Sequence, residues 1–157
     1  MNKKNILLIF GFGYTAKFMC QKFSKKNWEV FCTTRFKEKA KEIKSFNATP
    51  VFFDDEKKIE GILRKNLYIL STVPPENGKD PVIENYGYLF KKNSERLKWA
   101  GYLSTTSVYG DKKGGWVTED AVLEPNLERS VSRVTAEKSW LRFGENFSIK
   151  TMIFRLA

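Results

Sequence analysis

The sequence contains no histidine, only two cysteines and no long apolar run. Because histidine is the commonest metal ligand and general base, its absence argues against zinc sites and serine–histidine–aspartate catalysis. Cys20 and Cys32 lack CxxC spacing, and we predict no metal site. No stretch approaches the roughly 18 apolar residues of a membrane span, and the N-terminus lacks the features of a signal peptide. We therefore expect a cytoplasmic protein without a membrane partner.

The composition is that of one folded domain. Its 157 residues are 41% hydrophobic and 15% aromatic, which is enough for a packed core. The net charge of +10 is large enough to attract a polyanion such as nucleic acid. The basic residues are nevertheless dispersed among acidic and aliphatic ones, as on solvated helix faces. We favour that interpretation and predict no nucleic-acid partner.

Apolar runs alternate with amphipathic segments along the whole chain. Continuous runs are typical of strands buried on both faces, and spacings of three and four indicate helices. The predicted strands are Asn5–Phe10, Trp28–Thr33, Pro50–Phe53, Leu67–Thr72, Trp99–Ser104 and Ile149–Leu156. The predicted helices are one around Ala16, Met19 and Phe23, then Lys37–Phe46, Ile59–Lys65, Pro81–Arg96 and Leu127–Phe143, the last ended by Gly144. This order predicts a Rossmann-type, doubly wound parallel sheet in a three-layer α/β/α domain over residues 1–157.

A glycine-rich turn follows the first strand. Its sequence GFGYTA matches G-x-G-x-x-G/A, in which the first glycine permits a tight turn and the second lets the backbone approach a pyrophosphate. The last position, Ala16, allows close helix packing, and the helix N-terminus faces the anion. A turn without a ligand is the alternative. The predicted cofactor-binding residues here are Gly11, Phe12, Gly13, Tyr14 and Thr15.

The end of the second strand predicts which dinucleotide binds. Sites that prefer NAD usually carry a carboxylate there, whereas this chain has Thr34 and Arg35. A guanidinium suits a 2′-phosphate, so we predict NADP, with NAD as the alternative. Arg35 could instead simply begin a basic helix. Asp54, after the third strand, could accept a hydrogen bond from the adenine or cap a turn.

Four segments resemble the short-chain dehydrogenase/reductase superfamily, in particular its extended, nucleotide-sugar-epimerase-like branch. They are GFGYTA, STVPP, LSTTSVYG and AEKSWL. The run YLSTTSVYGDKKGGWVTED, followed by SRVTAE, is most similar to an atypical subgroup of NAD-dependent epimerase/dehydratase-like proteins. The resemblance implies an NAD(P)-dependent oxidoreductase or epimerase-like protein acting on a nucleotide-sugar-like or other small hydroxy or keto substrate. It also implies that Thr105 polarises the substrate and that Ser71, Thr72 and Val73 lie along the nicotinamide ribose.

The chain departs from the superfamily at its catalytic pair. The usual Tyr-x-x-x-Lys lies eight and four residues before a glutamate, and counting back from Glu137 gives Arg129 and Arg133. Arginine stays protonated at neutral pH, so it cannot transfer the proton. Tyr109 is the nearby phenol that could act as an acid, with packing as its alternative role. Two functions remain open: an epimerase-like enzyme with an unidentified acid, or a non-catalytic NADP-binding or sensing module.

The helical wheel of the last predicted helix leaves the role of the arginines open. Leu127, Val131, Val134 and Leu141 form an apolar stripe, and both arginines project from nearly the opposite side. Arg129 and Arg133 are therefore either part of a solvated or interface face, or face the cofactor phosphate or an acidic substrate. Arg133 is included among the predicted cofactor-binding residues.

The superfamily's C-terminal substrate lobe is not in this sequence. We expect the chain to be the N-terminal part of a longer protein, a truncated product, or a minimal cofactor domain that works with a partner. An exposed edge at the sixth strand would favour a homodimer.

Overall fold

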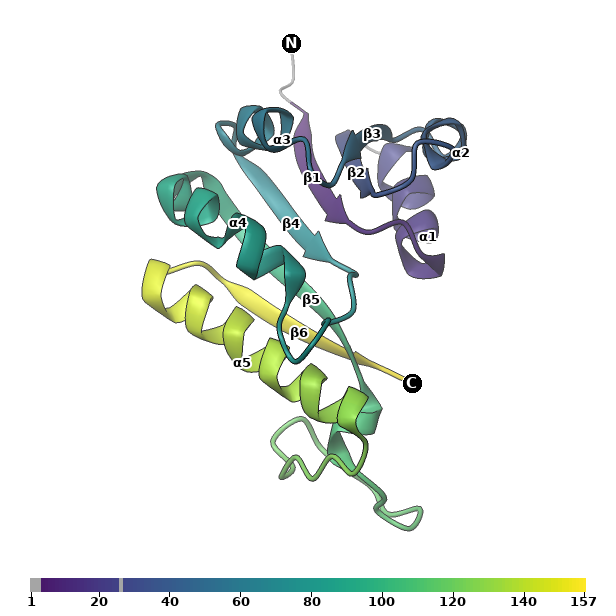
Figure 1. Cartoon of the computed structure of the whole chain (residues 1–157), viewed down its shortest axis with the longest axis vertical. Helices are drawn as coiled ribbons and strands as arrows, with labels where there is room; N and C mark the ends of the chain where they lie inside the picture. Colours follow the sequence, from purple (N-terminus) through teal and green to yellow (C-terminus); the bar gives the residue numbers. More distant parts are fainter. Residues whose placement is uncertain (1–3, 26) are drawn as a thin grey trace.

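The computed structural model describes residues 4–25 and 27–157 of the predicted domain. One sheet of six parallel strands runs through it, in the order β3-β2-β1-β4-β5-β6 (Figure 1). The strands are β1 (Asn5–Phe10), β2 (Trp28–Thr34), β3 (Thr49–Phe52), β4 (Leu67–Ser71), β5 (Leu97–Thr105) and β6 (Thr151–Leu156). The α-helices are α1 (Tyr14–Ser24), α2 (Lys39–Ser45), α3 (Glu56–Leu63), α4 (Pro81–Lys92) and α5 (Glu128–Phe147), with short 3-10 helices η1 (Ser94–Arg96) and η2 (Thr106–Tyr109). The predicted Rossmann-type fold is confirmed.

Two apolar clusters, one on each face of the sheet, form the core. In β1, Leu8 and Phe10 pack toward α3, α4 and α5, whereas Leu7 and Ile9 pack toward α1 and α2. Because β1 is buried on both faces, its sequence is a continuous apolar run rather than an alternating one. Full burial of each such side chain stabilises the fold by about 1.5–3 kcal/mol.

The strand order reverses between β1 and β4. β1 leads through α1 to β2 and β3 on one side, and the chain then crosses to β4, β5 and β6 on the other. At such a reversal the loops after neighbouring strands diverge and leave a crevice at the carboxyl ends. In Figure 1, residues 110–127, drawn in green, extend beyond the end of the sheet.

Two helix ends differ from the prediction by four residues. The segment predicted as one helix over Pro81–Arg96 is α4, which ends at Lys92, followed by η1. In contrast, α5 continues past Gly144 and ends only at Phe147, followed by Ser148 in the left-handed region at φ 54°. Gly144 serves close packing instead of ending the helix, because a Cβ there would collide with the side chain of Thr151.

The apolar stripe predicted for α5 does not face the sheet. Leu127, Val131 and Leu141 are 45%, 49% and 40% exposed. The opposite side, which carries Arg133, packs against β5 and β6 through the buried Trp140. The helical wheel failed because two large aromatics, Trp140 and Phe143, supply much of the buried surface of α5. The polar residues beside them are satisfied by hydrogen bonds that the wheel cannot anticipate.

Candidate functional site

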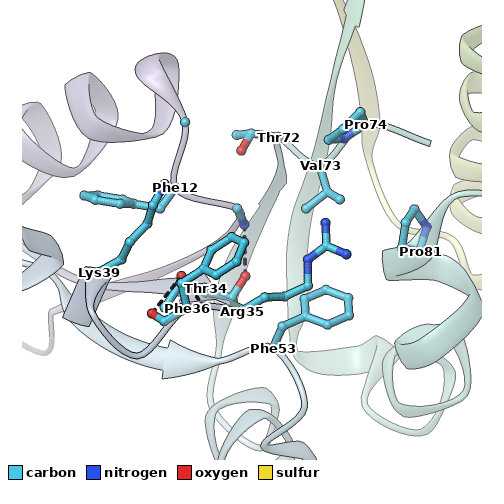
Figure 2. A pocket seen from close by; sticks show the side chains of 13 residues that line it. Phe12, Thr34, Arg35, Phe36, Lys39, Phe53, Thr72, Val73, Pro74 and Pro81 are labelled. Carbon is cyan, nitrogen blue, oxygen red and sulfur yellow. Dashed lines mark hydrogen bonds between the residues drawn. The ribbon is translucent and has the colours of Figure 1, made fainter. Parts of the chain in front are cut away.

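A cavity of about 250 Å³ lies where the strand order reverses (Figure 2). It is called the switch-point cavity below. Seven residues predicted to bind a cofactor line it: Gly11, Phe12, Gly13, Thr34, Arg35, Thr72 and Val73. The other lining residues are Thr33, Phe36, Lys39, Phe53, Pro74 and Pro81. The loops after β1, β2 and β4 thus converge on one space.

Hydrogen bonds from the neighbouring strands hold the turn after β1. The Gly11 amide donates to Thr33 Oγ1 at 2.9 Å, and Thr72 Oγ1 donates to the carbonyl of Phe10 at 2.9 Å. Gly11 has φ +93°, and a Cβ there would lie 2.6 Å from Thr72 Oγ1. Only glycine therefore fits at this position without strain and collision.

Gly13 differs from Gly11, because its backbone would tolerate a side chain. It has φ −87°, and no heavy atom within residues 4–25 and 27–157 lies within 4 Å of its hypothetical Cβ, outside its own chain neighbours. Gly13 is also the residue before α1, and the first turn of α1 carries neither a side-chain cap nor an acidic residue. The N–H groups at the start of α1 are therefore available to an anion that approaches the open side of Gly13.

Cationic side chains lie on the β2 side of the cavity. The Thr34 hydroxyl accepts from the Phe36 amide at 3.1 Å and fixes the loop from which Arg35 projects. Figure 2 shows the Arg35 guanidinium between Val73 and Phe53. Arg35 Nη2 donates to Glu76 Oε1 at 2.9 Å, although both side chains are about half exposed. Together with Lys39, Arg35 makes the described lining positively charged, without a carboxylate.

The remaining predicted cofactor residues lie outside this lining. Tyr14 is 90% exposed and Thr15 half-buried in the first turn of α1, and Asp54 is exposed after β3. Ser71 is buried at the end of β4, and its hydroxyl has no hydrogen-bond partner in the described structure. Arg133 lies in a different cavity.

Sequence reasoning missed Phe36, Lys39, Phe53, Pro74 and Pro81. Lys39 could have been predicted, because it lies four residues after Arg35, near the start of the predicted basic helix. Pro74 directly follows the STV segment that was predicted to bind the cofactor. The other three residues, Phe36, Phe53 and Pro81, line the cavity because separate loops approach each other in the folded chain. The periodicity of the sequence does not reveal such contacts.

A second cavity of about 390 Å³, called the arginine cavity below, adjoins the first. Its lining consists of Pro74, Pro75, Thr105, Ser107, Arg129, Ser132 and Arg133. Pro74 lines both cavities, so the loop after β4 forms a common wall. The structure thus brings the predicted catalytic Thr105 together with Arg129 and Arg133, the two residues predicted to stand at the Tyr and Lys positions.

Arg133 is held in place by β5. Its Nη1 donates to the Tyr102 hydroxyl at 3.1 Å and to the carbonyl of Leu103 at 2.8 Å. Burial raises the pKa of Tyr102 to about 12, although the adjacent Arg133 charge opposes this increase. Tyr102 therefore remains a neutral phenol at physiological pH and serves as the acceptor that orients Arg133.

Comparisons with solved structures define the fold family. A functionally unknown conserved protein from Silicibacter pomeroyi DSS is 32% identical with a TM-score of 0.87, over 98% of this chain and 53% of that one. A UDP-glucuronic acid 4-epimerase from Bacillus cereus, solved with UDP-glucuronic acid and NAD, is 23% identical with a TM-score of 0.69, over 96% and 55%. A dTDP-glucose 4,6-dehydratase from Bacillus anthracis, solved with NAD, is 18% identical with a TM-score of 0.70, over 96% and 54%. The chain has the fold of the extended short-chain dehydrogenase/reductase superfamily.

The chain spans about half the length of these solved structures. The sequence matches no family model and no curated protein. Of the helices in the described ranges, none is long and apolar enough to cross a membrane.

Tyr109, the other predicted catalytic residue, lies apart from the arginine cavity. Its hydroxyl accepts from Arg155 Nη1 at 2.8 Å, and Arg155 Nη2 donates to Glu137 Oε2 at 2.9 Å. Glu137 is only 2% exposed, and its hydrogen bond raises the pKa of Arg155. Glu137, from which the predicted catalytic positions were counted, therefore anchors α5 to β6, and Tyr109 belongs to that anchor.

Proposed function

We propose that this chain is the nicotinamide-dinucleotide-binding domain of an oxidoreductase or epimerase-like protein of the short-chain dehydrogenase/reductase type. The observation that carries the proposal is the uncapped start of α1, which opens into the switch-point cavity beside two cations. Dinucleotide phosphates are anions that need such donors. The epimerase and dehydratase solved with NAD support the class of cofactor.

The proposed division of roles follows the lining of the cavity. The amides at Gly13 and the start of α1 would hold the pyrophosphate, and Thr34 would contact the adenosine ribose while Arg35 binds its 2′-phosphate. Thr72 and Val73 would contact the nicotinamide side. When bound, the cofactor supplies the hydride acceptor or donor. Because Gly11 has no Cβ, the turn after β1 lies close to Thr72. This contact would hold the loops that bind the pyrophosphate and the nicotinamide side at a fixed separation.

We propose NADP rather than NAD as the preferred cofactor. Arg35 and Lys39 both line the cavity at the end of β2, where a 2′-phosphate would add negative charge. Arg35 currently pairs with Glu76, but an exposed pair of this kind contributes only about 0–1 kcal/mol. A phosphate dianion can therefore replace the carboxylate at little cost.

The proposed substrate is a small hydroxy or keto compound, with nucleotide sugars as one class. Thr105 would polarise the reacting oxygen from its place beside the switch-point cavity. One observation favours the second candidate, a binding or sensing module without turnover: the arginine cavity holds Arg129 and Arg133 in place of the Tyr and Lys that transfer the proton.

Binding titrations with NADPH and NADH test the proposal. For Arg35→Gln we expect about 10- to 100-fold weaker NADPH binding and unchanged NADH binding, because one charge-assisted hydrogen bond contributes about 1.5–3 kcal/mol. Lys37→Gln is the matched control, since Lys37 is exposed and does not line the cavity. Equal affinities of the wild type for both cofactors would refute the NADP preference, and no binding of either would refute the dinucleotide site. Hydride exchange between NADPH and candidate sugars separates the enzyme from the module.

A further inference from the structure

We infer that the arginine cavity binds an oxyanion of the substrate, either a carboxylate or a phosphate group. The inference rests on the proposed function, because it makes the substrate of that dinucleotide-dependent protein an acidic one. It assigns Arg129 and Arg133 a binding role in the positions from which proton transfer is lost.

Arg133 is preorganised to bind such a group. The two N–H groups of Nη1 have acceptors in Tyr102 and Leu103, which fixes the plane of the guanidinium. A guanidinium has five N–H donors, so three remain on Nε and Nη2. These three have no acceptor in the described part of the chain, although Arg133 is half-buried. A planar guanidinium with free donors matches the two oxygens of a carboxylate or phosphate.

Arg129 and the hydroxyls complete the lining. Arg129 is exposed and forms no ion pair or hydrogen bond within residues 4–25 and 27–157. The Thr105 hydroxyl accepts from the Ser107 amide at 3.2 Å, which leaves its own proton free to donate. Ser132 adds a further hydroxyl on the same helix as the arginines. Every polar side chain of this lining can donate to an anion.

The positive charge in the cavity has no matching carboxylate in its described lining. Two acids of neighbouring segments, Asp80 and Glu137, are already engaged in hydrogen bonds. Asp80 accepts from Trp140 Nε1 at 3.1 Å and from two backbone amides, and Glu137 binds Arg155. Two arginines four residues apart on one helix repel each other, and an anion between them would remove that repulsion.

The arginine cavity and the switch-point cavity are separate enough to be filled together. Of their lining residues only Pro74 is common, and neither arginine lines the switch-point cavity. The cofactor phosphates would lie near Gly13 and Arg35, which line the switch-point cavity and not the arginine cavity. The oxyanion in the arginine cavity therefore belongs to a second molecule next to the cofactor.

Calorimetric titration of the full chain tests this inference. Inorganic phosphate and oxalate serve as probes at constant ionic strength, each with and without saturating NADPH. We expect one probe or both to bind in either condition, and Arg129→Gln to weaken that binding about tenfold, as expected for loss of one charge-assisted hydrogen bond. Arg142→Gln is the control, because Arg142 is exposed on the same helix outside the cavity, and it should leave the affinity unchanged. Tighter phosphate binding indicates a phosphoester substrate, and tighter oxalate binding a carboxylic acid.

Three outcomes overturn the inference. Competition between NADPH and the probes would mean that the arginines serve the cofactor's own phosphates. An equal loss of affinity in Arg129→Gln and Arg142→Gln would mean that only the general positive charge attracts anions. No probe binding to a protein that still binds NADPH would refute the oxyanion site and leave the proposed function intact. Probe binding without any NADPH binding would instead refute the proposed function.

Discussion

Replacing the two glycines of the turn after β1 separates a structural role from a binding role. At Gly11, φ +93° costs a residue with a Cβ about 1–2 kcal/mol, and the collision 2.6 Å from Thr72 Oγ1 adds about 1–3 kcal/mol of overpacking. Gly11→Ala should therefore lower the free energy of unfolding by about 2–5 kcal/mol.

Gly13→Ala should instead leave stability nearly unchanged. The backbone at φ −87° accepts alanine, and a methyl group there meets no heavy atom within 4 Å in the described structure. Alanine is a poorer N-cap than glycine, but it restricts the unfolded chain, and these opposing effects leave about 0.5 kcal/mol or less. The same methyl group would occupy the path of the pyrophosphate. Loss of one charge-assisted hydrogen bond weakens NADPH binding about 10- to 100-fold.

Urea unfolding measures the first effect, and fluorescence titration with NADPH measures the second. The expected pattern is a destabilised Gly11→Ala and a Gly13→Ala that is stable but binds NADPH poorly. A Gly13→Ala protein with unchanged NADPH affinity would show that the open side of Gly13 does not face the cofactor. A stable Gly11→Ala protein would show that the left-handed turn is not required.

Three further predictions follow from individual contacts. Glu76→Gln should free Arg35 and tighten NADPH binding by about two- to fivefold without affecting NADH, measured by the same titration. Glu137→Gln leaves the partly buried Arg155 without its counter-ion and should cost about 3 kcal/mol, seen as a fall in Tm of about 6–12 °C, whereas Glu145→Gln on the exposed side of α5 should change little. Burial raises the pKa of Tyr102 to about 12, so the folded state keeps a proton that the unfolded chain loses near pH 10. The stabilising contribution of Tyr102 is complete below about pH 10 and decreases by about 2.7 kcal/mol as the pH rises through 12. The free energy of unfolding of Tyr102→Phe should decrease less over that range, and an equal decrease would contradict the assignment.

The fold could be predicted from the sequence because the parallel sheet leaves a strong local pattern. Strands buried on both faces, such as Asn5–Phe10, are continuous apolar runs, and the helices between them restart the periodicity of three and four. One error arose because glycine can either end a helix or allow close packing within it. Gly144 suggested a helix end, but it provides close contact with Thr151.

The site was predictable where a backbone motif defines it and less so where tertiary contacts do. GFGYTA identified the turn because its chemistry is local, and Gly11, Phe12 and Gly13 do line one cavity. The ion pair of Arg35 with Glu76 depends on two loops that approach each other only in the folded sheet. The separation of Arg133 from the switch-point cavity likewise depends on the orientation of α5, which the helical wheel reversed.

The contacts of α5 show how the helix can carry arginines at the positions predicted for a catalytic pair and keep its place in the fold. Trp140 donates to the buried Asp80 at the start of α4, and Glu137 binds Arg155 on β6, so two anchors of the helix lie outside positions 129 and 133. These contacts help to hold both positions beside Thr105 in the lining of the arginine cavity. Because arginine retains its proton, arginines at these two positions suit the binding of negative charge rather than proton transfer. We therefore propose that α5 presents two guanidinium groups to an acidic substrate.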